Sequence, residues 1–381
     1  MNVAFVCNEY PPARGGGIGT AVRALARGLV AQGHRAIVVG LYHDASVEDD
    51  DGVTVYRLAF PMQNFLWRSL ASRRFLHRQL QPLVRRHRID IVEWPDFQGM
   101  FHAPAEGAVD VVRLHGTSLN ERERGLMRPN PLSQPVWEHF ERHILHSVPH
   151  WIGVSHWYLE ASKQRFGLVP QTEAVVPNGV DAACFFPPTS DTGRRDQVFY
   201  AGAYRTRKGV RTLVQAAEQA WSQGAVFDLL LMGYEADCTR DALRALAPRF
   251  GHRVTFAPFG GQHAVAEQMR RSRVFAMPSH HETCGNGWLE AAMCGTPVIG
   301  STAACGPEMV TNGRHGWVVD PDDVQATANA IQRLLGDTPG WQAMSAALRA
   351  EASERFGLPV CVQQSLRFYA DCLRGHAEVL R

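Results

Sequence analysis

Residues 273–301, RVFAMPSHHETCGNGWLEAAMCGTPVIGS, combine an apolar run, a polar glycine-containing loop, a helical run and a second apolar run. A strand, a helix and a second strand in this order are typical of a parallel sheet that helices cover on both faces. Ligands of such sheets bind beyond the carboxyl ends of the strands. The loop that starts this helix, framed by Glu282 and Glu290, is therefore a predicted binding site.

The same alternation of apolar strands and amphipathic helices extends outward through the chain in two series. We expect strands at 2–7, 35–41, 90–94, 109–115 and 150–155, and then at 197–203, 227–233, 253–259, 273–279, 296–301 and 316–320. The turn-rich segment 175–188 separates the two series. They predict an α/β protein of two doubly wound, Rossmann-like parallel-sheet domains, at 1–177 and 178–357, that face each other across a deep cleft.

The length and composition indicate a globular protein of two domains. A chain of 381 residues is too long for one ordinary core, which also favours two domains. Its 45% hydrophobic and 20% charged residues are typical of a globular protein, and a net charge of +2 gives no general attraction to nucleic acid. No apolar run reaches the ~18 residues of a membrane span, and the first strand lacks the basic start of a signal peptide. Eight cysteines without a C-x-x-C pair indicate a reduced, cytoplasmic protein.

The loop after the first expected strand, residues 8–20, is rich in glycine. Thr20 can cap the helix that follows, and the backbone can pass close to a ligand at Gly15, Gly16, Gly17 and Gly19. The dinucleotide fingerprint fails because Thr20 and Val22 stand where G-x-G-x-x-G needs its third glycine, and no G-K-[ST] of a P-loop follows. We interpret the segment as a ligand-binding loop; a flexible turn is the alternative.

Two further strand ends carry candidate ligand groups. His115 ends the strand at 109–115, where a role in a binding cleft and a purely structural role are both open. Arg205, Arg207 and Lys208 precede a helix, and cations beside a helix N-terminus are unfavourable unless they share an anion with it. Lys208 is one of only two lysines among 39 basic residues. These residues predict a phosphate site; a solvated basic turn is the alternative.

The loop at 280–290 adds amides and acids to the candidate site. Several backbone N–H groups, those of Cys284, Gly285 and Asn286 among them, lie where the helix starts and suit a diphosphate. An acid beside an anion would repel it, so we expect Glu282 and Glu290 to accept hydrogen bonds from hydroxyl groups, as a nucleotide sugar provides. Helix capping by Glu282 is the alternative.

In this order, the motifs resemble the retaining glycosyltransferases of family 4, which have the GT-B fold, over nearly the whole chain. The resemblance rests on PPARGGGIGT, RLHGT, VPNGVD, AGAYRTRKG, ETCGNGWLEAAMCGTPVIG and GPEMVTNGRHGWVV. It implies a hexosyltransferase that uses a UDP- or GDP-sugar in glycan, glycolipid or natural-product biosynthesis. Residues 178–357 would bind the donor and 1–177 the acceptor, and a last helix at about 358–378 would cross back to the first domain.

The resemblance also implies roles for matching residues. The catalytic set would be His115 at the transferred sugar, Arg205 and Lys208 at the donor diphosphate, and Glu282 at the donor sugar, while Glu290 would hold the ribose. Further donor contacts are implied at Gly16, Gly17, Gly202, Gly233, Thr283, Cys284, Gly285, Asn286 and Gly287. Relatives commonly have Gly-Phe-Gly where this chain has Thr283-Cys284-Gly285, which bears on the choice of donor sugar.

Retention of the anomeric configuration follows from the resemblance. The sequence offers no obvious side-chain nucleophile, so we expect front-face displacement, in which the departing phosphate helps to accept the acceptor's proton while Arg205 and Lys208 offset its growing charge. No metal ion or other cofactor is expected. The DPDD segment at 320–323, which resembles a metal-binding D-x-D, is interpreted as a helix cap.

The acceptor under this interpretation is a carbohydrate, a lipid-linked molecule or a small molecule. Residues 67–88 carry seven arginines and no acid between apolar residues. Such a helix either rests on the inner, anionic face of a membrane or packs on the core with a solvated basic face. Three alternatives to glycosyl transfer stay open: a nucleotide-sugar epimerase on the same fold, a nicotinamide-dependent Rossmann oxidoreductase and a non-catalytic sugar-binding module.

Overall fold

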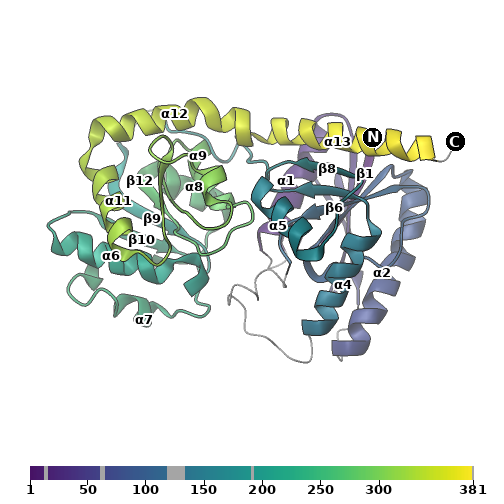
Figure 1. Cartoon of the computed structure of the whole chain (residues 1–381), viewed down its shortest axis with the longest axis horizontal. Coiled ribbons are helices and arrows are strands. Elements are labelled where there is room, and N and C mark those ends of the chain that lie inside the picture. The colour runs from purple at the N-terminus through teal and green to yellow at the C-terminus, as the bar shows by residue number, and fades with distance from the viewer. Residues whose placement is uncertain (13–15, 61–64, 118–133, 190–192, 380–381) are drawn as a thin grey trace. The chain divides into compact units, whose positions relative to one another are not determined.

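The computed structural model describes residues 1–12, 16–60, 65–117, 134–189 and 193–379 (Figure 1). The chain divides into two compact units: unit 1 is 1–179 together with 358–381, and unit 2 is 180–357. The boundary that we expected after residue 177 falls after Gly179 in this division. Each unit has its own sheet.

Unit 1 is built on a sheet whose described strands follow the order β3-β4-β2-β1-β5-β6-β7-β8. All neighbours pair in parallel except the β3–β4 hairpin. The strands are β1 (Asn2–Val6), β2 (Arg35–Tyr42), β3 (Ser46–Asp50), β4 (Val53–Ala59), β5 (Ile91–Pro95), β6 (Val109–Leu114), β7 (His150–Gly153) and β8 (Thr172–Val175). The helices are α1 (Gly17–Ala31), α2 (Phe65–His87), η1 (Phe97–Gly99), α4 (Gln134–Ser147), α5 (His156–Phe166) and α13 (Leu358–Val379).

The strands of unit 1 supply two hydrophobic cores, because successive side chains of a strand point to opposite faces of the sheet. On β1, Ala4 and Val6 belong to the core that α2, α4 and α5 cover. Val3 and Phe5 belong to the core that α1 and α13 cover. Burial on both faces explains why β1 is apolar from Val3 to Val6.

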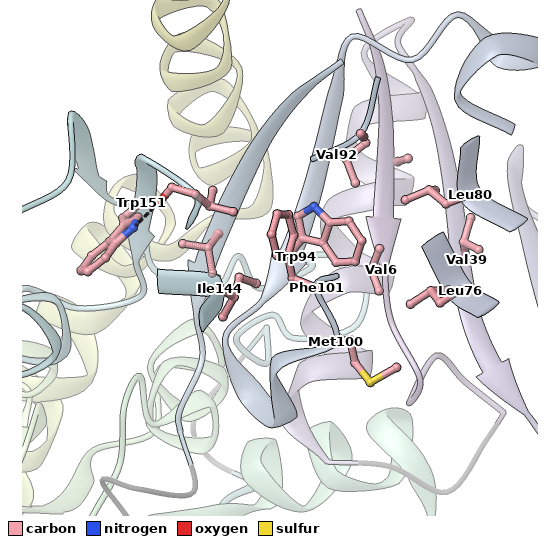
Figure 2. Close-up of a cluster of buried hydrophobic side chains, with 14 of the residues drawn as sticks. Val6, Val39, Leu76, Leu80, Val92, Trp94, Met100, Phe101, Ile144 and Trp151 are labelled. Carbon is pink, nitrogen blue, oxygen red and sulfur yellow. Dashed lines mark hydrogen bonds between the residues drawn. The ribbon is translucent and has the colours of Figure 1, made fainter. Parts of the chain in front are cut away.

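α2 packs the apolar side of the arginine-rich segment on the first of these cores. Leu76 and Leu80 are fully buried, and Figure 2 shows them within the cluster. Arg73 is buried as well: its Nε donates to the carbonyl oxygen of Gly99 at 2.6 Å, and its guanidinium lies over the ring of Phe140. The described part of the helix is therefore core-packed, and its basic face is exposed at Arg74, Arg78, Arg85 and Arg86.

A buried ion pair fastens α13 to the strands of unit 1. The guanidinium of Arg113 on β6 donates to both carboxylate oxygens of Glu93 on β5, at 2.8 and 3.0 Å. On α13, Ser365 accepts from Arg113 at 3.1 Å, and the hydroxyl of Tyr369 donates to Glu93. None of the four residues is more than 3% exposed. Burying a charge is costly unless it is paired and hydrogen-bonded, so Arg113 and Glu93 depend on each other and on the partners from α13. The network therefore holds β5, β6 and α13 together.

Unit 2 has a fully parallel sheet, whose described strands follow the order β11-β10-β9-β12-β13-β14. The strands are β9 (Arg195–Ala201), β10 (Asp228–Met232), β11 (Val254–Ala257), β12 (Ser272–Ala276), β13 (Val298–Ser301) and β14 (Gly316–Val319). The helices are η3 (Thr206–Lys208), α6 (Val210–Ser222), α7 (Arg240–Arg244), η4 (Gly251–Arg253), α8 (Gly261–Arg271), α9 (Asn286–Met293), α10 (Gly306–Met309), α11 (Val324–Gly336) and α12 (Thr338–Phe356). The predicted class, α/β with two parallel-sheet domains, is confirmed.

The structure differs from the sequence predictions in three strands and in the start of the first helix. β3, β4 and β8 were not predicted: β3 and β8 are edge strands with much exposed surface, and β4 mixes polar with apolar residues. The prediction that Thr20 caps the first helix is wrong, because α1 begins at Gly17 with Gly16 as its N-cap. Two of the loop's glycines, Gly17 and Gly19, are thus part of the first helical turn.

Candidate functional site

The carboxyl edge of the unit 2 sheet holds the predicted phosphate and sugar residues. β9 and β12 are neighbours, so the loops that follow them lie side by side. The amide of His280 donates to the carbonyl oxygen of Arg207 at 2.8 Å. Gly209 has a φ of 70°, and a Cβ at this position would lie 1.9 Å from the carbonyl oxygen of Pro278. Direct backbone contact between the two loops therefore sets the place of Lys208.

Lys208 and Glu282 form an ion pair across these loops. The Nζ atom lies 2.5 Å from Oε1 of Glu282, and the side chains are 22% and 11% exposed. Burial raises the pKa of Glu282, but the charge and hydrogen bond of Lys208 outweigh it, so the pKa stays below its ordinary value. The N-cap of α9 is Gly285, which differs from the alternative in which Glu282 caps this helix. An ammonium group has three donors, so Lys208 keeps donors for a further anion.

We expect Gly209→Ala to destabilise unit 2 by ~2–4 kcal/mol, because the added Cβ collides with backbone and the φ is strained for alanine. Urea unfolding measures the loss. Gly261→Ala is the matched control: its φ is 79°, and no described atom lies within 4 Å of the Cβ position, so the cost should be only ~1 kcal/mol. Equal losses in the two variants would contradict the loop contact.

Glu290 lies one turn into α9 and has no ion-pair or hydrogen-bond partner for its carboxylate among the residues that the structure describes. Burial raises the pKa of this carboxyl group to about 8. It lies near Cys184, whose own pKa is raised to about 11 by burial and by the charges of Asp181 and Glu290. A partly buried, unpartnered carboxyl group is costly in the free protein. It suits a ligand that brings hydroxyl donors.

Packing explains the glycines at the start of α9. Gly285 has a φ of 69°, and a Cβ there would lie 2.2 Å from the ring of Trp288. A Cβ on Gly287 would lie 3.0 Å from the ring of Phe275. The ring of Trp288 and the positive φ therefore require a glycine at 285 whether or not a ligand approaches, whereas the contact at Gly287 is only tight. The other predicted donor residues of this loop are buried or partly buried: Thr283, Cys284 and Asn286.

Gly202 and Gly233 follow β9 and β10, where the backbones of the two strand ends touch. A Cβ on Gly233 would lie 1.9 Å from the carbonyl oxygen of Gly202, and Gly202 itself has a φ of 149°. Arg205 follows on the same edge; it is exposed, and no described residue pairs with its guanidinium. This guanidinium is available to an anion near Lys208.

In unit 1, a carboxylate already occupies the glycine-rich loop. The amide of Gly16 donates to Oε2 of Glu9 at 2.9 Å, and a Cβ on Gly19 would lie 1.9 Å from the carbonyl oxygen of Glu9. Gly17 is the first residue of α1. A phosphate at Gly16 would have to displace Glu9. Glu9 was not among the predicted residues, because it stands eight positions before Gly17 and only the path of the loop brings its carboxylate to the amide at the helix N-terminus.

His115 follows β6 and lines a hollow in unit 1 with Glu93, Arg113, Asn178 and Ser365. Burial and the charge of Arg113 lower the pKa of its imidazole to about 3. The ring is neutral at physiological pH, so it exchanges hydrogen bonds with hydroxyl groups without carrying charge.

Three of the remaining expectations concern metal sites, membrane spans and cysteines. In the DPDD segment, Asp323 is the N-cap of α11 and accepts from the amide of Ala326 at 2.8 Å, so the predicted cap is confirmed. Within the described ranges, no group of three or more His, Cys, Asp or Glu side chains could hold a metal ion. None of the described helices is long and apolar enough to cross a membrane. All eight cysteines are buried and unbridged.

Comparisons with known proteins assign the family. Residues 15–183 match the family model described as Glycosyltransferase Family 4, and residues 195–337 match the model described as Glycosyl transferases group 1. Two parallel-sheet α/β domains with these matches define a glycosyltransferase of the GT-B class. The chain belongs to family 4 of these enzymes, as its motifs predicted. The nicotinamide-dependent oxidoreductase is thereby set aside.

Individual relatives differ in how much of the chain they match. The chain is 32% identical to D-inositol 3-phosphate glycosyltransferase from Xylanimonas cellulosilytica over 52% of its own length and 51% of the relative. It is 25% identical to glycogen synthase from Mycobacterium tuberculosis over 99% of its length and 96% of the relative. In its alignments with the inositol-phosphate enzymes, the chain spans about half the length of these curated relatives.

Solved structures share the fold over nearly the whole chain. Sucrose-phosphate synthase from Thermosynechococcus elongatus gives a TM-score of 0.81 at 22% identity, over 98% of this chain and 100% of that one. HepE from Anabaena in complex with UDP-glucose gives a TM-score of 0.75 at 19% identity, over 97% and 100%. The GT-B fold is thus confirmed.

Proposed function

We propose that this protein transfers a hexosyl group from a UDP- or GDP-sugar to a hydroxyl group in glycan, glycolipid or natural-product biosynthesis, with retention and without a metal ion. One observation carries the proposal: the Lys208–Glu282 ion pair lies at the carboxyl edge of the unit 2 sheet, at the loop that leads into the helix bearing Glu290. A cation next to hydroxyl-accepting acids matches the diphosphate and sugars of such a donor. A structural neighbour, HepE, has been solved with UDP and with UDP-glucose.

The donor diphosphate is assigned to Lys208 and Arg205. Lys208 is held at a set place by Glu282, while the exposed Arg205 supplies a planar group that can bind two phosphate oxygens. In front-face displacement the bond between the anomeric carbon and the phosphate oxygen breaks, and negative charge grows on the leaving diphosphate. Fixed cations stabilise that charge most strongly in the transition state, which lowers the barrier. These two side chains therefore take the place of a metal ion.

The sugar and ribose hydroxyls are assigned to acids and to His115. Glu290, without a partner in the described structure, accepts from the ribose hydroxyls, and Glu282 accepts from the donor sugar through its second carboxylate oxygen. His115, neutral at physiological pH, contacts the transferred sugar. Its low pKa leaves proton acceptance from the acceptor hydroxyl to the departing phosphate.

Calorimetric titration with UDP, GDP, ADP, dTDP and NAD in EDTA tests the proposal. We expect tight binding of UDP or GDP without metal, and we expect the matching sugar nucleotide to release the same diphosphate. Binding of NAD alone, or nucleotide binding that requires a restored divalent cation, would contradict the proposed donor chemistry. Interconversion of two sugar nucleotides without release of the diphosphate would indicate an epimerase instead.

The acceptor class is decided by a second experiment on the basic face of α2. A lipid-linked acceptor requires contact with an anionic surface, which the exposed Arg74, Arg78, Arg85 and Arg86 would provide. Sedimentation with vesicles of phosphatidylglycerol, and not with phosphatidylcholine, would support a lipid-linked acceptor and a location at the inner membrane face. If the protein does not sediment with phosphatidylglycerol vesicles even at low salt, a carbohydrate or small-molecule acceptor is favoured.

A further inference from the structure

We propose that Asp96 is a positioning residue for His115, acting through a turn that Tyr158 completes. The inference rests on the proposed function, because it takes His115 to contact the transferred sugar.

The turn after β6 is held by side chains of two other elements. Asp96, directly after β5, is fully buried, and its Oδ1 accepts from the amides of His115 and Gly116 at 2.8 and 3.1 Å. The hydroxyl of Tyr158 on α5 donates to Oδ2 of Asp96 at 3.1 Å and accepts from the amide of Thr117 at 2.6 Å. Three consecutive amides therefore end on one carboxylate–phenol pair.

β6 ends at Leu114, so the amides that follow it need hydrogen-bond acceptors other than a neighbouring strand, and Asp96 and Tyr158 supply them. Gly116 has a φ of 146°, so the chain leaves the direction of β6 immediately after His115. Buried backbone amides need partners, and bonds to a charged acceptor are stronger and shorter than neutral ones. Asp96 thus fixes the backbone of His115 on both sides, through the amides of His115 and Gly116. A small misplacement of a group at a reaction centre costs much in rate.

The protonation of Asp96 falls within an accessible pH range. Burial raises its pKa to about 6, although the amides of His115 and Gly116 and the Tyr158 hydroxyl favour the charged form. Protonation would turn charge-assisted bonds to the turn into weaker neutral ones. On the surrounding elements β5, β6, α5, α4 and α2, the described ionisable side chains that are buried are those of Glu93, Asp110, Arg113, Tyr158, Glu141 and Arg73.

Asp96→Asn tests the inference because asparagine keeps the shape and one acceptor but loses the charge. The probe is release of UDP from UDP-glucose, or of GDP from GDP-mannose, with water as acceptor; the sugar–phosphate bond breaks and a water oxygen adds to the anomeric carbon. We expect kcat to fall about tenfold at pH 7.5, with nucleotide affinity unchanged because the donor residues lie in unit 2. We also expect the decline of wild-type kcat below pH 6 to disappear.

Asp110→Asn is the matched control. Asp110 lies at the other end of β6, is buried, and has a pKa raised by burial to about 6. It accepts from Nε1 of Trp94 and from the amide of Ala105, at 2.7 and 2.9 Å, and not from the turn that bears His115. This variant should lose stability but keep the wild-type dependence of kcat on pH. Tyr158→Phe removes the hydroxyl group that accepts from the amide of Thr117, so it should also lower kcat in the same assay. This second variant tests the inference if Asp96→Asn does not fold.

The outcomes separate the inference from the proposed function. Wild-type kcat and an unchanged decline below pH 6 in Asp96→Asn would overturn the positioning role while leaving glycosyl transfer intact. The same change in Asp110→Asn as in Asp96→Asn would also overturn it, since general loosening of unit 1 would then be the cause. A wild-type protein that binds none of the nucleotides and releases none from a sugar nucleotide would refute the proposed function itself.

Discussion

Replacing Lys208 by methionine will weaken nucleotide affinity about 10–100-fold and lower turnover about 10²–10³-fold. The change keeps an unbranched side chain that is only one atom shorter, but it removes the charge that faces the leaving diphosphate. It also leaves Glu282, only 11% exposed, without the ammonium that lowers its pKa. Calorimetry with UDP and GDP and the sugar-nucleotide release assay measure the two effects.

Two controls separate loss of function from loss of structure. Lys163→Met removes the chain's other lysine, which pairs with Glu160 and Glu173 at the surface of unit 1, and it should change neither affinity nor turnover. The double variant Lys208→Met/Glu282→Gln removes both charges of the pair, so it should regain stability but not activity. Wild-type affinity in Lys208→Met would show that the donor diphosphate is bound elsewhere.

Glu290→Gln will make the free protein more stable at high pH while weakening its hold on the nucleotide. The folded-state pKa of Glu290, about 8, lies above the 4.5 of an ordinary glutamate. Stability from the neutral carboxyl group is therefore fully present below pH 4.5 and is lost as the pH rises through 8. Glutamine stays neutral at every pH, so it avoids this loss, which is ~1–5 kcal/mol at pH 9.

Urea unfolding at pH 5 and pH 9, without ligand, measures this effect. The variant and the wild type should be nearly equally stable at pH 5, and the variant should be clearly more stable at pH 9. At pH 9, where the wild-type carboxyl group is ionised, UDP or GDP affinity of the variant should be about tenfold lower, because a neutral amide accepts hydroxyl hydrogen bonds less strongly than a carboxylate. A stability difference that is independent of pH would mean that Glu290 does not titrate in the way its burial indicates.

Much of the fold could be predicted because its signals are local. Strands such as β1, β9 and β12 contain a run that is buried on both faces and is therefore apolar, at 3–6, 198–200 and 274–276, and the residue pattern already displays such runs. The helix cap at Asp323 was also predictable, since the cap bonds to an amide three residues later. Edge strands such as β3 and β8 were missed because exposure removes the apolar signal.

The candidate site was predictable as a set of residues but not as an arrangement. Arg205, Lys208, Glu282 and Glu290 stand after strands in a pattern that resembles family 4, so their residue types could be singled out. Their pairing could not. Lys208 and Glu282 are 74 positions apart, and they meet because β12 pairs beside β9 although β10 and β11 lie between them in the chain.

Residues without a motif depend entirely on packing. In the sequence, nothing distinguishes Asp96 from other acids that follow a strand. The parallel register of β5 and β6 brings its carboxylate to the amides of His115 and Gly116. Likewise, Glu290 acquires its raised pKa from burial, which no local pattern expresses. The order of residues thus specifies which segments become buried strands and capped helices, because those choices depend on neighbours along the chain. Strand order and burial specify which charges meet and which stay unpaired, because Coulomb and desolvation energies depend on distance in space.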